Sequence, residues 1–341
     1  MRHINIPIFI PHLGCPNQCI FCNQRYISGR SDFEVESVET QIIQVLSTVS
    51  IDDECEIAFF GGSFTGIDRN LMISLLEIAQ KYVNLGRVKG IRMSTRPDYI
   101  SKEIIDILNK YSISCVELGI QTMNDDVLSF LKRGHTVEQT ILATKLLNES
   151  KIPFVGQMMI GLPSSTVEDE IYCAEQISKL GACGTRIYPT LIFKNTEMEE
   201  LYHSGDYIPM ELDEAVTRSA KVLRVFYEYG IPCIRIGLCD SDNLHSTDSF
   251  VAGPNVPNIG EMVKGELIKN LIVERLDKNY NYRDYTLIIE CARGQVSQVV
   301  GNKRINIIKL KKIFGFRSIK VKENIELSYM SIKLSIKEEN S

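Results

Sequence analysis

The 341-residue chain lacks the features that would place it in a membrane or on a nucleic acid as a whole. No apolar run approaches the roughly 20 residues that span a bilayer, which argues against a transmembrane segment and a membrane partner. The N-terminus passes directly into strand-like sequence without signal-peptide architecture, so we expect a cytoplasmic protein. A positive net charge is also lacking: the value of −5 argues against nucleic-acid binding by the whole surface.

The sequence also lacks the setting in which cysteines form disulfides. Without a secretion signal, we expect its ten cysteines to be reduced thiols. Seven are isolated in mostly apolar surroundings, where a thiol behaves as a small buried hydrophobe: Cys55, Cys115, Cys173, Cys183, Cys233, Cys239 and Cys291. The length fits one large domain, or one with a small appendage, and 44% hydrophobic with 24% charged residues is ordinary for a globular protein.

The other three cysteines are grouped. Cys15, Cys19 and Cys22 follow the apolar run 4–10 in a C-x3-C-x2-C spacing that allows their sulfurs to gather. Thiolates gathered in this way hold soft metals and iron–sulfur clusters. A closed structural site uses four ligands, so three cysteines leave one metal position open for a substrate or cofactor. Scattered buried thiols, or a zinc site completed elsewhere in the chain, are the alternatives.

Strand-like and helical segments alternate along the chain from residue 4 to residue 238. Strands are expected at 4–11, 55–60, 90–95, 114–120, 154–160, 185–191 and 233–238, with amphipathic helices between them. Six or seven such strands indicate a parallel βα architecture, whose chemistry lies at the C-terminal ends of the strands. Periodicity alone does not separate an open sheet from a closed barrel.

Small and polar residues recur at these strand ends. The set comprises Gly61, Gly62, Ser63, Thr65, Ser94, Arg96, Gln121 and Gln157. Paired glycines let a backbone approach a ligand that a Cβ would exclude, although a tight turn explains them equally well. Arg186 and Tyr188 on the sixth strand could face a cofactor or a substrate. Among the histidines, His12 and His135 are candidates, with a structural role the simpler reading for His135.

With Phe21 one residue before the third cysteine, the motif resembles the radical S-adenosylmethionine (SAM) signature. Its context, residues 7–16 and 21–24, resembles the Elp3-like branch of that superfamily. The resemblance implies a [4Fe-4S] cluster on Cys15, Cys19 and Cys22, whose fourth iron binds the amino and carboxylate groups of SAM. It implies reduction by a partner such as flavodoxin or ferredoxin, and cleavage of SAM to methionine and a 5′-deoxyadenosyl radical that abstracts hydrogen.

The same resemblance implies a fold and a set of SAM contacts. The fold is a partial (βα)6 TIM-like barrel over residues 1–240, followed by a connecting loop and helix (241–280) and a basic α+β domain (281–341). Phe21 and the strand-end set are then the SAM-binding residues: the Gly61-Gly62 pair at the methionine amino group, Ser94 and Arg96 toward ribose and carboxylate, Gln121 near the ribose, and Gln157 in the matching place on the next strand. Ser63 stands where an acidic residue is common.

The C-terminal region has a different charge from the rest of the chain. Residues 291–322 contain nine Lys or Arg and no Asp or Glu. Strands are expected at 285–291, 319–321 and 327–334, with helices at 295–300 and 305–314. This β-α-loop-α-β order resembles a KH module, whose G-x-x-G loop clamps a nucleic-acid backbone. Arg304 replaces the second glycine of that loop, which limits backbone approach but adds a phosphate-seeking guanidinium. RNA is therefore a predicted partner; a small α+β cap with a solvated basic helix is the alternative.

Three functional hypotheses follow. The first is a radical SAM enzyme that acts on RNA, as in tRNA modification. The second is a radical reaction on a small molecule or porphyrin, as in the oxygen-independent coproporphyrinogen oxidases. The third is a non-enzymatic iron–sulfur sensor with an RNA-binding tail. Elp3 proteins also carry an acetyltransferase domain, but residues 241–341 show no acetyl-CoA-binding signature, so acetyl transfer is not expected.

Overall fold

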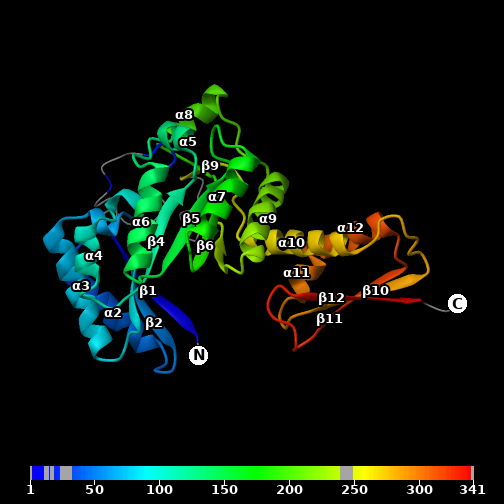
Figure 1. The fold of residues 1–341 in the computed structure, drawn as a ribbon, viewed down its shortest axis with the longest axis horizontal. Coiled ribbons are helices and arrows are strands. Elements are labelled where there is room, and N and C mark those ends of the chain that lie inside the picture. Colours follow the sequence, from blue (N-terminus) through cyan, green and yellow to red (C-terminus); the bar gives the residue numbers. More distant parts are fainter. Residues whose placement is uncertain (1, 11–14, 16–18, 24–32, 239–248, 339–341) are drawn as a thin grey trace. The chain divides into compact units, whose positions relative to one another are not determined.

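The computed structural model of the chain describes residues 2–10, 15, 19–23, 33–238 and 249–338 (Figure 1). The predicted candidate His12 lies outside these ranges, as do parts of the cysteine motif and of the 241–280 connection. The chain divides into two compact units, one made of residues 1–211 and 225–255, the other of 212–224 and 256–341. No helix in the described part is long and apolar enough to cross a membrane.

The first unit is built on a seven-stranded parallel sheet in which the strand order follows the chain. The strands are β1 (His3–Phe9), β2 (Glu54–Phe60), β3 (Gly90–Thr95), β4 (Ile113–Gln121), β5 (Phe154–Ile160), β6 (Gly184–Pro189) and β8 (Cys233–Ile236). β1 and β8 are the two edge strands of this order and do not pair with each other, so the curled sheet is a half-barrel rather than a closed barrel. This confirms the predicted partial barrel.

Helices connect consecutive strands of this sheet. They are α2 (Val35–Thr48), α3 (Arg69–Asn84), α4 (Lys102–Leu108), α5 (Asp125–Phe130), α6 (Val137–Glu149), α7 (Val167–Lys179) and α9 (Leu212–Glu228). Their starts follow from capping chemistry: the Ser101 side chain accepts from the Ile104 backbone, as expected, and Thr136 and Thr166 open full capping boxes.

The two faces of the half-barrel sheet differ in polarity. On the outer face, Leu118 pairs with Gly156, and a Cβ on Gly156 would meet Ile177 of α7 at 2.6 Å, so the glycine lets α7 pack closely. The inner face presents charged and amide residues at alternate positions. Among them are Glu117 on β4 and Arg186 on β6, which form an ion pair across β5. A sheet covered by helices on one side and polar on the other leaves the inner face for ligands.

Two small elements next to the half-barrel were not predicted. β7 (Ile192–Phe193) pairs antiparallel with β9 (Phe250–Ala252), and α8 (Glu197–Ser204) follows β7. Gly253, directly after β9, has φ +115° and comes close to the Thr190 carbonyl, a position that only glycine fits well. Such short strands pair across a long stretch of chain, so local periodicity carries no signal for them.

The second unit is an α+β fold of its own. Its elements are α10 (Ile259–Arg275), β10 (Tyr285–Cys291), α11 (Val296–Val300), a 3₁₀ turn (Asn302–Arg304), α12 (Ile305–Phe314), β11 (Ser318–Glu323) and β12 (Ile332–Glu338). β10 is central, parallel to β11 and antiparallel to β12. The expected last strand at 327–334 was placed too early, because a turn in which the Ser331 amide donates to the Ser328 carbonyl precedes it.

Candidate cluster and cofactor site

The described part of the cysteine loop is fastened to two helices by backbone hydrogen bonds. The Ile20 amide donates to the Leu131 carbonyl (3.2 Å), and the Ile20 carbonyl accepts from the Met198 amide of α8 (3.0 Å). All three side chains belong to one buried apolar cluster, against which Phe21 packs. In this structure Phe21 therefore helps to seat the loop on the end of α5 and the start of α8.

Two of the three cysteine sulfurs, those of Cys15 and Cys19, lie beside polar side chains. The Cys15 sulfur is 3.3 Å from the Ser63 hydroxyl, and Arg133 Nη1 donates to the Cys19 sulfur at 3.5 Å. Cys19 is buried, whereas Cys15 and Cys22 are half-buried. The Cys22 amide donates to the Cys19 carbonyl at 3.0 Å, which forms the turn between the last two cysteines.

The chemistry of this donor set fits an iron–sulfur cluster. Among the residues that the structure describes, no three His, Cys, Asp or Glu side chains lie close enough to hold one ion. In a cubane cluster each cysteine binds a different iron, so its sulfurs need not converge on one point. Thiolates of such a cluster also accept hydrogen bonds, which the Ser63 hydroxyl and the Arg133 guanidinium can supply.

The glycine pair after β2 holds the strand that leads into the cysteine loop. Gly61 has φ +97°, and a Cβ there would lie 3.3 Å from the Ile10 amide nitrogen, which itself donates to the Phe60 carbonyl at 2.7 Å. The Gly62 carbonyl accepts from the Ser94 hydroxyl at 3.4 Å. Gly61, Gly62 and Ser94 therefore meet at one edge of the sheet, as their strand-end positions predict.

Thr65 and Arg96 lie near this edge but have protein partners. The Thr65 hydroxyl is 2.7 Å from that of Thr95 and donates to the Tyr99 carbonyl at 2.9 Å. Arg96 is 1% exposed and forms a two-pronged ion pair with Asp98 (2.9 and 2.8 Å), while its Nη1 has no hydrogen-bond partner. In this structure Thr65 braces the turn after β3, and Arg96 keeps one N–H available.

Gln121 and Gln157 face each other across neighbouring strands. Each side-chain amide donates to the other's carbonyl oxygen, at 3.0 and 2.8 Å. Gln121 has φ +69° at a register shift between β4 and β5, a bulge that aims its side chain along the sheet edge. The sequence predicted that both residues lie at strand ends, but the hydrogen bonds between their side chains form at the register shift that only the folded sheet shows.

Arg133, which was not among the predicted site residues, is part of the site. It lies between α5 and α6, is 9% exposed, and donates from Nη2 to the Gly119 carbonyl at 2.9 Å while its Nε has no partner. A Cβ on Gly119 would meet this guanidinium at 2.6 Å, so the glycine makes its space. The only sequence signal was a cation in a helix connection, which is usually exposed.

His135, two residues further on, is buried beside the same guanidinium. Its ring interacts with the Ile120 backbone but makes no well-aligned hydrogen bond among the described residues. Burial, with the nearby Arg133 and Arg96 cations, lowers the pKa of His135 to about 3. The imidazole is therefore neutral at physiological pH.

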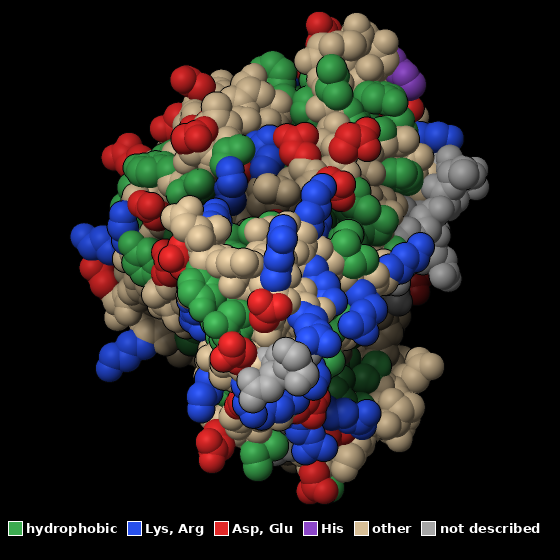
Figure 2. Space-filling model, turned by 90° about the vertical axis from the view of Figure 1, so that its right-hand side faces the viewer, with side chains coloured by type: hydrophobic (Ala, Val, Ile, Leu, Met, Phe, Trp, Pro, Cys, Tyr) green, Lys and Arg blue, Asp and Glu red, His purple; other side chains and the backbone are tan. Residues whose placement is uncertain are grey.

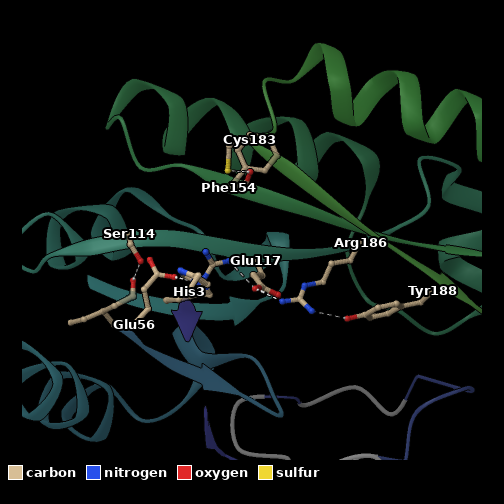
Figure 3. A network of polar contacts seen from close by, with 10 residues as sticks. His3, Glu56, Ser114, Glu117, Phe154, Cys183, Arg186 and Tyr188 are labelled. Carbon is tan, nitrogen blue, oxygen red and sulfur yellow. Dashed lines mark hydrogen bonds and ion pairs between the residues drawn. The ribbon is translucent and has the colours of Figure 1, made fainter. Parts of the chain in front are cut away.

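A charged network crosses the inner face of the half-barrel (Figure 3). Glu117 on β4 accepts from Arg186 Nη2 at 2.8 Å and from Arg92 Nη1 at 3.1 Å. Arg92 also donates to Glu56 at 3.0 Å, and Arg186 to the Tyr188 hydroxyl at 3.4 Å. Arg186 and Tyr188, predicted to face a cofactor or a substrate, thus lie on the polar inner face.

A parallel half-barrel with a three-cysteine loop at the C-terminal ends of its strands defines the class of radical SAM proteins. The "Radical SAM superfamily" description matches residues 9–175, and "Radical_SAM C-terminal domain" matches residues 183–269. The chain therefore belongs to the radical SAM superfamily of enzymes, which require a reductant.

Within this superfamily the chain is similar to Elp3 proteins. It is 36% identical over 148 residues to the tRNA uridine(34) acetyltransferase of Methanocaldococcus jannaschii, covering 42% of this chain and 27% of the relative. It is 33% identical over 191 residues to Elongator complex protein 3 of Dictyostelium discoideum, covering 50% and 34%. The match thus spans about a quarter to a third of these relatives.

Solved structures agree on the fold. The archaeal Methanocaldococcus infernus Elp3 with an N-terminal deletion superposes with a TM-score of 0.61 at 22% identity, covering 81% of this chain and 64% of that one. Methylornithine synthase superposes with a TM-score of 0.50 at 13% identity, covering 81% and 83%. These likenesses confirm the predicted half-barrel.

Proposed function

We propose that this protein binds a [4Fe-4S] cluster through Cys15, Cys19 and Cys22, cleaves SAM reductively, and modifies a tRNA. The observation that carries the proposal is the placement of Cys15 and Cys19 beside Ser63 and Arg133, at the C-terminal edge of a radical SAM half-barrel. When bound, the cluster supplies the electron that breaks a carbon–sulfur bond of SAM and so generates the radical that abstracts hydrogen.

The residues around the cysteines have distinct roles in this proposal. Gly61 lets the chain pack against Ile10, because a Cβ there would lie 3.3 Å from the Ile10 amide nitrogen, and the Gly61-Gly62 pair at this sheet edge would contact the amino group of SAM. Gln121 and Gln157 exchange some of their mutual hydrogen bonds for ribose hydroxyls. Arg133 pairs with the SAM carboxylate, since it is a buried cation beside Cys19 with an unpartnered Nε.

RNA as the substrate is supported by the names of the relatives and by charge. Two archaeal relatives are named tRNA uridine(34) acetyltransferases. The second unit of this chain carries the basic stretch 291–322, with nine Lys or Arg and no acidic residue. A small one-electron protein such as flavodoxin or ferredoxin is the proposed reductant.

Anaerobic reconstitution tests the chemistry. The protein, loaded with iron and sulfide and given dithionite and SAM, should form 5′-deoxyadenosine, measured by liquid chromatography. Modified nucleosides of bulk tRNA from wild-type and deletion strains should then differ by at least one species. A protein that takes up four irons without forming 5′-deoxyadenosine would overturn the enzymatic proposal, and identical nucleoside profiles would overturn the tRNA assignment.

Arg133→Met should reduce SAM cleavage about 10- to 100-fold, because one charge-assisted hydrogen bond to a carboxylate contributes about 1.5–3 kcal/mol. The loss should lie mainly in the dissociation constant for SAM, measured by equilibrium binding to the reconstituted protein. Lys132→Met is the matched control, since Lys132 is an exposed cation that pairs with Glu197. Equal SAM affinity in both variants would contradict the role given to Arg133.

A further inference from the structure

The three-stranded sheet of the second unit has one face that α10, α11 and α12 do not cover (Figure 1); on this face Thr286 in the central strand is buried, whereas the lysines are exposed. Strand alternation directs Leu287, Ile289 and Ile319 to the buried face. The intervening positions form three rows on the opposite face: Ser318–Thr286–Lys337, Lys320–Ile288–Ser335 and Lys322–Glu290–Lys333. This set of nine residues is called the open sheet face below.

The open sheet face is strongly basic. Its four lysines, Lys320, Lys322, Lys333 and Lys337, are all exposed. Its single carboxylate, Glu290, is half-buried and is occupied by the Lys322 ammonium at 2.9 Å and the Asn324 amide at 2.7 Å. Lys320 and Lys337 have no carboxylate within ion-pair distance among the described residues, so most of this charge remains available to a ligand.

The spacing of these lysines fits an extended polyanion. Lys322 and Lys333 flank Glu290 on opposite sides, which places their backbones about 10 Å apart, twice the spacing of neighbouring strands. Lys320 and Lys322 are two residues apart on one strand, about 6.6 Å. These separations are within or near the Debye length of about 8–10 Å, so the charges act together. A single small anion would instead require donors that converge on one point.

The Gly301–Arg304 turn, the other candidate RNA contact in this unit, is less suited to that role. Lys303 and Arg304 both have positive φ (47° and 62°), and the Arg304 side chain occupies the position where the second glycine of a G-x-x-G loop would offer bare backbone. Exposed Ile305 and Ile308 lie among the cations of α12, and Lys309 is 3.9 Å from Glu266. The turn and helix therefore present a mixed surface.

We propose that the open sheet face, through Lys320, Lys322, Lys333 and Lys337, contacts the phosphate backbone of the RNA substrate. Figure 2 shows many Lys and Arg side chains, with Asp and Glu side chains among them, on the face turned to the viewer. The inference rests on the proposed function, because it assigns the surface that holds the RNA on which the enzyme acts. Lysine contacts to phosphates supply affinity and a salt dependence, without reading sequence.

The test compares two variants of the reconstituted full-length protein that lose the same charge. The first replaces the four lysines of the open sheet face by Gln (K320Q/K322Q/K333Q/K337Q). The second replaces Lys303, Arg304, Lys309 and Lys312 on the turn and α12 by Gln. Binding of unfractionated tRNA is measured by filter retention at several salt concentrations, and circular dichroism checks folding. A double variant, K320Q/K337Q, serves if the fourfold variant does not fold.

The first variant should bind tRNA at least roughly tenfold more weakly than wild type near 0.1 M salt. The slope of a plot of log K against log salt concentration should become shallower by about 3, since each phosphate contact contributes about 0.7–0.9 to that slope. The second should stay within about twofold of wild type. Wild-type binding retained by the first variant, or an equal loss in both, overturns the assignment of this face. A wild-type protein that does not bind tRNA at all instead refutes the proposed RNA substrate.

Discussion

Replacing Cys19 by Ala should abolish formation of 5′-deoxyadenosine, to less than about 1% of wild type. Cys19 is the buried member of the three cysteines, and the loop around it is fixed by the Ile20 backbone. An alanine there leaves two thiolates, which cannot hold three irons of a cubane cluster. Anaerobic reconstitution followed by iron analysis, electron paramagnetic resonance of the reduced protein and product chromatography measures the loss.

Cys183→Ala is the matched control for this experiment. Cys183 is an exposed cysteine at the start of β6, outside the three-cysteine loop, so its loss should leave iron content and SAM cleavage unchanged. Both variants should retain wild-type circular dichroism. A Cys19→Ala protein that still made 5′-deoxyadenosine would refute the assignment of the cluster to this loop.

Glu117→Gln should lower the free energy of unfolding by about 3–5 kcal/mol. Glu117 is the carboxylate between Arg92 and Arg186, and all three side chains are at most 13% exposed. Arg92 keeps Glu56 as a partner, but Arg186 loses the carboxylate with which it pairs in the described part of the chain, and an uncompensated buried charge is costly. Urea unfolding followed by circular dichroism measures the change, since the chain has no tryptophan for fluorescence.

Glu39→Gln provides the comparison for an exposed pair. Glu39 contacts Lys81 at 2.5 Å with both side chains more than 40% exposed and accepts from the Tyr82 hydroxyl at 2.9 Å, so its loss should lower stability far less than the loss of Glu117. A Glu117→Gln protein as stable as this control would show that the network across the inner face does not stabilise the half-barrel. Retained stability with lost RNA modification would instead give Glu117 a role in the substrate site.

Much of the half-barrel was predictable because its signals are local. Each βα unit repeats an apolar strand and an amphipathic helix, and caps such as Ser101 and Thr136 mark the helix starts. The pair β7 and β9 was missed for the opposite reason. It joins two or three residues on each side across a long intervening stretch, and the short α8 that follows β7 lacks a long apolar pattern.

The candidate site shows the same division. The cysteine spacing and the strand-end residues Gly61, Ser94 and Gln121 are local patterns, so they could be proposed from the chain alone. Arg133 could not, because it reaches Cys19 across 114 positions and only the packing of α5 against the loop brings them together. The same holds for Thr65, whose partner Thr95 lies 30 positions away, whereas Arg96 pairs with Asp98 only two positions along the chain.

The sequence by itself determined the three-cysteine loop and the regular βα alternation, and the resemblance of that loop to the radical SAM signature implied the half-barrel. The tertiary structure decided which buried cation lies beside the loop, how Glu117 balances Arg92 and Arg186, and which lysines share the open sheet face. The physical reason is the separation along the chain over which each kind of signal acts. Spacing and periodicity act between near neighbours, whereas ion pairs, strand register and burial join residues that the chain alone keeps far apart.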